Sequence, residues 1–105
     1  RGVIDGARLA QMKKGAYLVN TARGQLVDEA ALVAALDSGQ IAGAGLDTLS
    51  KEPPPADHPL LGRKDVLVTP HSGWLGQSSW SRCIGFGMKN VEKFRSGAEL
   101  GFRAV

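Results

Sequence analysis

The sequence of 105 residues contains one cysteine, Cys83, and no long apolar run. A single cysteine excludes an internal disulfide and a metal centre built from several thiolates, and we expect no bound metal. A membrane-spanning helix needs roughly 20 consecutive apolar residues, which no stretch provides. The chain starts at Arg1 without an initiator methionine or a signal-peptide pattern. We therefore expect a cytoplasmic protein with no membrane partner, and we expect residue 1 to be a cut.

Acidic residues are slightly fewer than basic ones, with 10 against 13, which gives a formal net charge of +3. The basic residues are scattered, as at Lys13-Lys14 and Arg63-Lys64, and no run is as dense as a nucleic-acid-binding patch. Hydrophobic residues make up 43% and charged residues 22% of the chain, the balance of a globular protein. We expect at most one domain and no nucleic-acid partner.

Three segments show a helical pattern: residues 5–15, residues 28–39 and residues 77–96. The first two begin at Asp5 and Asp28, whose carboxylates can accept from the free N–H groups of a first helical turn. In the third segment, Gly85 and Gly87 each weaken a helix by about 1 kcal/mol relative to alanine. We therefore predict three helices, with a kink or close packing at these two glycines in the last one.

Three short apolar runs are predicted to be strands: residues 16–20, residues 41–46 and residues 66–68. Continuous apolar character between turn residues is typical of strands in a parallel sheet that is buried on both faces. The four prolines between Lys51 and Arg63 exclude a helix or a central strand in that loop. The alternation of helices and strands predicts an α/β fold with a parallel sheet covered on both faces.

Polar residues follow each predicted strand: Arg23 the first, Asp47 and Glu52 the second, and His71 the third. Because the carboxyl ends of parallel strands meet at one edge of a sheet, we expect these side chains to converge. A guanidinium can hold a carboxylate through two hydrogen bonds, and an imidazole titrates near neutrality. The set can perform acid–base chemistry on an anionic substrate, although each member alone is also an ordinary surface or loop residue.

Three motifs stand out at these strand ends. They are V-N-T-A-R-G at residues 19–24, G-L-D at residues 45–47 with E-P-P at residues 52–54, and T-P-H at residues 69–71. In this order and at these separations they resemble the D-isomer-specific 2-hydroxyacid dehydrogenases, and the similarity runs from Arg1 to about Gly97. The resemblance implies a partial Rossmann-type parallel sheet of about three strands flanked by helices. It also implies hydride exchange between NAD or NADP and a small 2-hydroxy or 2-oxo acid.

The resemblance assigns a role to each of the converging residues. Arg23 binds the substrate carboxylate, His71 carries the hydroxyl proton, and Glu52 hydrogen-bonds His71 and tunes its proton affinity. Asp47 matches the position that faces the nicotinamide carboxamide. The remaining residues implied to contact the cofactor are Thr21, Ala22, Arg23, His71, Ser72 and Gly73.

Glu52 and Trp74 narrow the substrate that the resemblance implies. Formate dehydrogenases of this fold have no hydroxyl proton to remove and carry glutamine at the Glu52 position, so Glu52 favours a hydroxy acid. Trp74 lies three residues after His71, which is similar to the His-x-x-Trp arrangement of the glycerate dehydrogenase and hydroxypyruvate reductase branch and implies substrate contact. A packing aromatic is the alternative interpretation of Trp74.

The family's Gly-x-Gly-x-x-Gly turn, which holds a pyrophosphate at a helix N-terminus, is absent from the sequence. We therefore expect residues 1–105 to be the C-terminal half of a nicotinamide-dinucleotide-binding domain, with residues 97–105 as a tail. We expect this half to be inactive alone and the full-length protein to be a homodimer. A non-catalytic protein on the same fold, either an NAD-binding corepressor or a scaffold, is the alternative.

Overall fold

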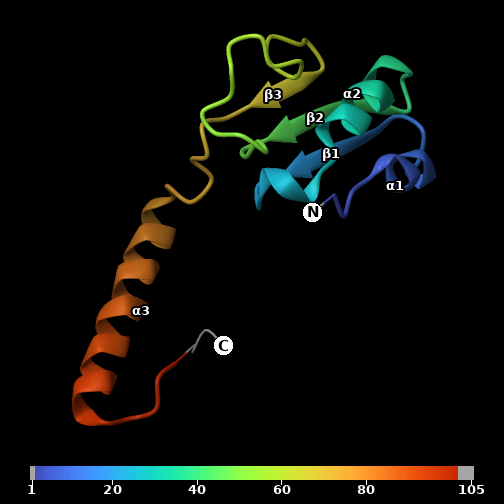
Figure 1. The fold of residues 1–105 in the computed structure, drawn as a ribbon. Helices are drawn as coiled ribbons and strands as arrows, with labels where there is room; N and C mark the ends of the chain where they lie inside the picture. The colour runs from blue at the N-terminus through green and yellow to red at the C-terminus, as the bar shows by residue number, and fades with distance from the viewer. Residues whose placement is uncertain (1, 102–105) are drawn as a thin grey trace. The chain divides into compact units, whose positions relative to one another are not determined.

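A computed structural model describes residues 2–101 of the chain (Figure 1). These residues form two compact units, the first ending at Gly73 and the second beginning at Trp74. The first unit contains α1 (Gly6–Gln11), β1 (Ala16–Asn20), the 3-10 helix η1 (Gly24–Leu26), α2 (Glu29–Asp37), β2 (Ile41–Leu46) and β3 (Val66–Val68). The second unit contains α3 (Gln77–Ser96). Residues 102–105 of the predicted tail lie outside the described residues.

The three strands form one parallel sheet in the order β1-β2-β3. Parallel neighbours need a crossover between them, and α2 provides it for β1 and β2. The predicted α/β fold with about three parallel strands is confirmed.

Side-chain caps explain where the first two helices begin. The carboxylate of Asp5 accepts from the backbone N–H of Arg8 at 2.9 Å, and that of Asp28 accepts from Ala31 at 3.0 Å. Both caps were predicted from the sequence. The first helix is shorter than predicted and ends at Gln11, because Met12 already has extended backbone angles.

The hydrophobic core of the first unit lies between the two helices and one face of the sheet. Its most deeply buried side chains are Leu9 of α1, Leu32 of α2, Ile41 of β2 and Leu60 of the loop that follows. The opposite face is open within this unit, where Tyr17 is 73%, Val19 70% and Leu67 68% exposed. The prediction that helices cover both faces is therefore wrong for the first unit, because α1 and α2 pack into the same core.

The second unit is built on α3, a helix of 20 residues that runs through Gly85 and Gly87 without interruption. It ends at Gly97, whose positive φ of 70° closes the last turn. The side chains of α3 are all at least partly exposed, including the apolar set Trp80, Ile84, Met88, Val91 and Phe94. None of the helices among residues 2–101 is both long and apolar enough to cross a membrane.

Candidate functional site at the carboxyl edge of the sheet

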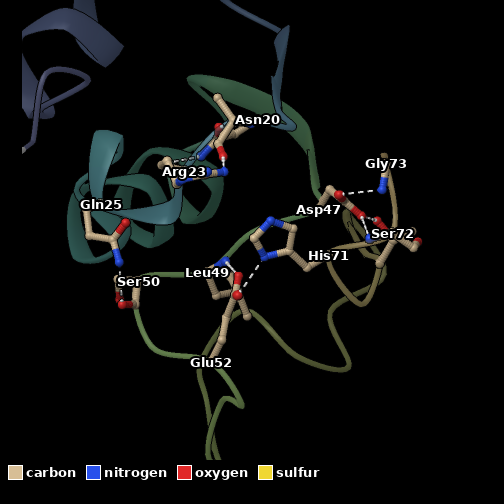
Figure 2. A network of polar contacts seen from close by, with 12 residues as sticks. Asn20, Arg23, Gln25, Asp47, Leu49, Ser50, Glu52, His71, Ser72 and Gly73 are labelled. Atoms are coloured by element: carbon tan, nitrogen blue, oxygen red, sulfur yellow. Dashed lines mark hydrogen bonds and ion pairs between the residues drawn. The ribbon is translucent and has the colours of Figure 1, made fainter. Parts of the chain in front are cut away.

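The three strands end level with one another at one edge of the sheet. Asn20 pairs in register with Leu46, and Leu46 pairs with Val68. The segments that follow the strands therefore start side by side, as the sequence predicted. Figure 2 shows the polar contacts at this edge.

Asn20, the last residue of β1, shapes the turn that carries Arg23. Its side chain is 7% exposed; the amide nitrogen donates to the carbonyl of Arg23 at 2.9 Å, and the amide oxygen accepts from the N–H of Ala22 at 3.1 Å. Thr21, Ala22 and Arg23 themselves are exposed. The guanidinium of Arg23 donates one N–H to the carbonyl of Ala22, at 2.7 Å, and its other N–H groups are left for a ligand.

Glu52 and His71 form a direct pair, with 2.7 Å between Oε2 of Glu52 and Nδ1 of His71. The other carboxylate oxygen of Glu52 accepts from the backbone N–H of Leu49 at 2.9 Å. The hydrogen bond from His71, followed by the one from Leu49, lowers the pKa of Glu52 below its ordinary value. An ionised Glu52 can only accept, so the imidazole carries a proton on Nδ1 and its Nε2 is left for other chemistry.

Asp47 fixes the turn in which His71 lies. Its carboxylate is buried and accepts from the hydroxyl of Thr69, from the N–H of Ser72 at 2.9 Å and from the N–H of Gly73 at 2.7 Å. The hydroxyl of Thr69, with help from these backbone N–H groups, lowers the pKa of Asp47. Within this turn His71 has a φ of 53°, a region that non-glycine residues seldom occupy and that the surrounding contacts must hold.

A cavity of about 400 Å³ lies beside the Glu52–His71 pair. Its polar lining is Asp47, Glu52, Thr69 and His71, and its apolar lining includes Leu49, Pro54, Leu61 and Val68. Apolar walls with a few convergent polar groups are typical of small-molecule sites.

The structure brings some of the predicted residues into contact and leaves others apart. It pairs Glu52 with His71 and joins Asp47 to Ser72 and Gly73. Arg23 starts from the neighbouring strand end, and it makes no hydrogen bond to the pair within residues 2–101. Trp74 belongs to the second unit, where its ring centroid lies 5.4 Å from that of Trp80.

Four residues that shape the site were given no role from the sequence: Asn20, Glu29, Ser50 and His58. An asparagine between a strand and a turn is a recognised local signal, because its side chain readily bonds to backbone two or three residues on. The other three are ordinary polar residues. Ser50 and His58 lie 21 and 29 positions after Glu29, and no local pattern links them to it.

A parallel sheet with polar groups gathered beyond its carboxyl ends defines a domain of the Rossmann type. The sequence profile described as "D-isomer specific 2-hydroxyacid dehydrogenase, NAD binding domain" matches residues 1–73. The chain therefore belongs to the D-isomer-specific 2-hydroxyacid dehydrogenase family, as the sequence motifs predicted.

Known proteins of this family resemble the chain in sequence and fold. A hydroxypyruvate reductase of Blautia hydrogenotrophica is 41% identical over 99 residues, which are 94% of this chain and 31% of that protein. A D-isomer-specific 2-hydroxyacid dehydrogenase of Xanthobacter autotrophicus Py2, solved with NADPH and MES, superposes with a TM-score of 0.84 at 40% identity, over 95% of this chain and 40% of that one. D-Lactate dehydrogenase of Lactobacillus jensenii, solved with NAD+, gives 0.83 at 35% identity, over 99% and 35%. The chain thus spans about a third of the length of these proteins.

Proposed function

We propose that the protein is an NAD- or NADP-dependent oxidoreductase that interconverts a D-2-hydroxy acid and a 2-oxo acid. The observation that carries the proposal is the Glu52–His71 pair, held at 2.7 Å beside a cavity at the carboxyl edge of the sheet. Family membership supports the same activity. The names of the relatives above, all reductases or dehydrogenases, give no support to a non-catalytic corepressor or scaffold.

Each residue of the pair has a distinct part in handling the proton. Glu52 accepts from Nδ1 of His71 and so fixes the tautomer that leaves Nε2 as a base. During oxidation, Nε2 takes the proton of the C2 hydroxyl, and the ionised Glu52 stabilises the imidazolium that results. During reduction, Nε2 returns that proton to the oxygen on C2, as a general acid.

Arg23 binds and orients the acid in this proposal. The N–H groups of its guanidinium that are not engaged with Ala22 can take the substrate carboxylate in a two-pronged hydrogen bond. That contact holds C2 and its oxygen near His71. Trp74 is proposed as a further substrate contact, as the His-x-x-Trp resemblance implies.

The residues at the sheet edge fit the nicotinamide end of a dinucleotide. Asp47 accepts three hydrogen bonds, and a carboxylate has about four lone-pair sites, so one acceptor site is left for a carboxamide N–H. Thr21, Ala22, Arg23, Ser72 and Gly73 would line the same pocket. When bound, the nicotinamide supplies the hydride acceptor and donor for C2.

The remaining proposals concern the assembly around this chain. We place residues 1–105 in the C-terminal half of the dinucleotide-binding domain, and we expect the pyrophosphate to bind outside them. We further propose a cytoplasmic homodimer for the full-length protein, and sedimentation velocity would measure its mass directly.

Turnover by the protein expressed at its full length tests the proposed activity. Reduced nicotinamide should be oxidised with a small 2-oxo acid such as hydroxypyruvate or glyoxylate. His71→Ala should lower kcat by roughly 10²–10⁴-fold, since it removes the proton carrier. Arg23→Lys should weaken substrate binding, because a point charge does not replace the two-pronged guanidinium.

A matched control is Lys51→Ala, which removes an exposed charge on the same loop as Glu52 and should leave turnover unchanged. Wild-type kcat in the His71 variant would refute the role given to the imidazole. Absence of turnover with every 2-oxo acid and both cofactors would refute the proposed activity.

A further inference from the structure

The carboxylate of Glu29 makes polar contacts with the β2–β3 loop (residues 47–65) at two residues, Ser50 and His58. Glu29 is the first residue of α2. Its Oε1 accepts from the backbone N–H of Ser50 at 2.7 Å, and its Oε2 accepts from the hydroxyl of Ser50 at 2.5 Å. The same Oε2 lies 3.4 Å from Nε2 of His58, eight positions further along the loop.

Ser50 is the more tightly held of the two points. Besides its two contacts with Glu29, its carbonyl accepts from the side-chain amide of Gln25 at 3.0 Å, a contact drawn in Figure 2. Ser50 therefore uses its N–H, its hydroxyl and its carbonyl on groups from η1 and α2. Because Ser50 precedes Glu52 by two residues, these contacts fix where the backbone enters the site.

His58 presents a donor to Glu29 rather than an acceptor. Its Nδ1 accepts from the backbone N–H of Leu60 at 3.3 Å, so a neutral ring carries its proton on Nε2, which faces the carboxylate. The side chains of His58 and Glu29 are 9% and 16% exposed, and Leu60 beside them is fully buried. The far end of the loop is thus tied to the same helix as its near end.

The position of the anchored loop determines the position of Glu52, and therefore its contact with His71. Leu49, which is buried in the core next to Ser50, donates its N–H to Glu52 at 2.9 Å. The other oxygen of Glu52 holds His71. A shift of residues 49–50 would therefore draw the carboxylate of Glu52 away from the imidazole.

We propose that Glu29 is a positioning residue, which anchors Ser50 and His58 to α2 and thereby keeps the carboxylate of Glu52 within hydrogen-bond distance of His71. Within residues 2–101, Glu29 makes no hydrogen bond to His71, and it is not among the residues that line the cavity. The catalytic meaning of this arrangement rests on the proposed function, whereas the geometry of the pair can be measured without turnover.

The test is an NMR titration of the Glu52 carboxyl in Glu29→Gln, with the signal assigned by its loss in Glu52→Gln. Removing a neighbouring negative charge lowers the pKa of a carboxyl group. Losing contacts that stabilise the ionised form raises it. We expect the pKa of Glu52 to rise toward its ordinary value in Glu29→Gln, a direction that the lost charge alone cannot produce.

Two further variants separate anchoring from charge and from unfolding. Asp57→Asn removes an exposed charge from the same loop, at a residue that makes no hydrogen bond within residues 2–101, and should not raise the pKa of Glu52. Ser50→Ala removes one contact of Glu29 without changing the charge, and should raise that pKa by a smaller amount. If Glu29→Gln does not fold, the pKa of Glu52 in Ser50→Ala tests the positioning role in its place.

An unchanged or lowered pKa of Glu52 in both Glu29→Gln and Ser50→Ala would overturn the positioning role, whatever the enzyme's activity. In the full-length enzyme, the supporting result is a kcat/KM profile whose acidic limb moves in Glu29→Gln but not in Asp57→Asn. A raised pKa of Glu52 in a protein that turns over no 2-oxo acid would support the positioning role and refute the proposed function.

Discussion

Substituting Gly24 by alanine should disturb both the stability of the fold and the Glu52–His71 pair. A β-carbon at Gly24 would lie 2.0 Å from the carbonyl carbon of Leu49, 2.2 Å from its oxygen and 2.3 Å from the nitrogen of Ser50. All three are backbone atoms, so no side-chain rotation relieves the overlap. The loop would have to retreat by about 1.5 Å to reach ordinary contact distance.

The energetic cost follows from what residues 49–50 hold in place. Overpacking of this kind costs about 1–3 kcal/mol, and the retreat also pulls Ser50 from Glu29 and Leu49 from Glu52. We therefore expect the free energy of unfolding to fall by at least about 1 kcal/mol in Gly24→Ala. The pKa of Glu52 should rise in the same variant.

Urea unfolding followed by circular dichroism measures the first effect, and Gly6→Ala is its matched control. A β-carbon at Gly6 meets the β-carbon of Ala31 at an ordinary 3.6 Å, and alanine suits a helix better than glycine does. Gly6→Ala should leave stability unchanged or raise it by up to about 1 kcal/mol. Equal unfolding midpoints for Gly24→Ala and the wild type would refute the reasoning, because the loop would then not rest on η1 as the structure has it.

Two further predictions concern the core and the acid stability of the first unit. Leu32→Ala should lower the free energy of unfolding by about 2–5 kcal/mol, since the side chain is fully buried and leaves a cavity; a loss below about 1 kcal/mol in urea would contradict its place in the core. Asp47 and Glu52 have lowered pKa values in the fold, so their contribution to stability is complete above the unfolded-state values near 4 and is lost as the pH falls through the folded-state values. When the free energy of unfolding is measured against pH, Asp47→Asn should lose less of it than the wild type does between about pH 5 and pH 2. Parallel curves for the two proteins would contradict a stabilising contribution from the ionised carboxylate of Asp47.

Much of the fold could be predicted because the relevant signals are local. The strand at residues 41–46 is a short apolar run between turn residues, and the helix that begins after Asp28 has a capping carboxylate and an apolar face. The position of the site followed from the same local signals, since the carboxyl ends of parallel strands must meet. Arg23, Glu52 and His71 could therefore be assigned to one edge from their order alone.

What could not be predicted depends on contacts between distant residues. Tyr17 and Val19 are apolar enough for a buried strand, yet both are exposed, because hydrophobicity alone does not say whether another segment of residues 2–73 covers them. The anchoring by Glu29 joins residues 21 and 29 positions away, and its members are common polar residues. Asp47 was assigned to the cofactor from its motif, and the structure adds that it holds the turn around His71.

The open face of the sheet has a practical consequence for handling this chain in solution. Within residues 2–101, β1 and β3 are edge strands, and their outward apolar side chains leave an uncovered patch next to unpaired backbone groups. Such edges can recruit further strands from neighbouring molecules, so concentrated samples of the first unit are prone to precipitate. Leu67→Lys, which places a charge at an exposed position of the edge strand β3, is the first change to make when preparing it for crystallisation or NMR.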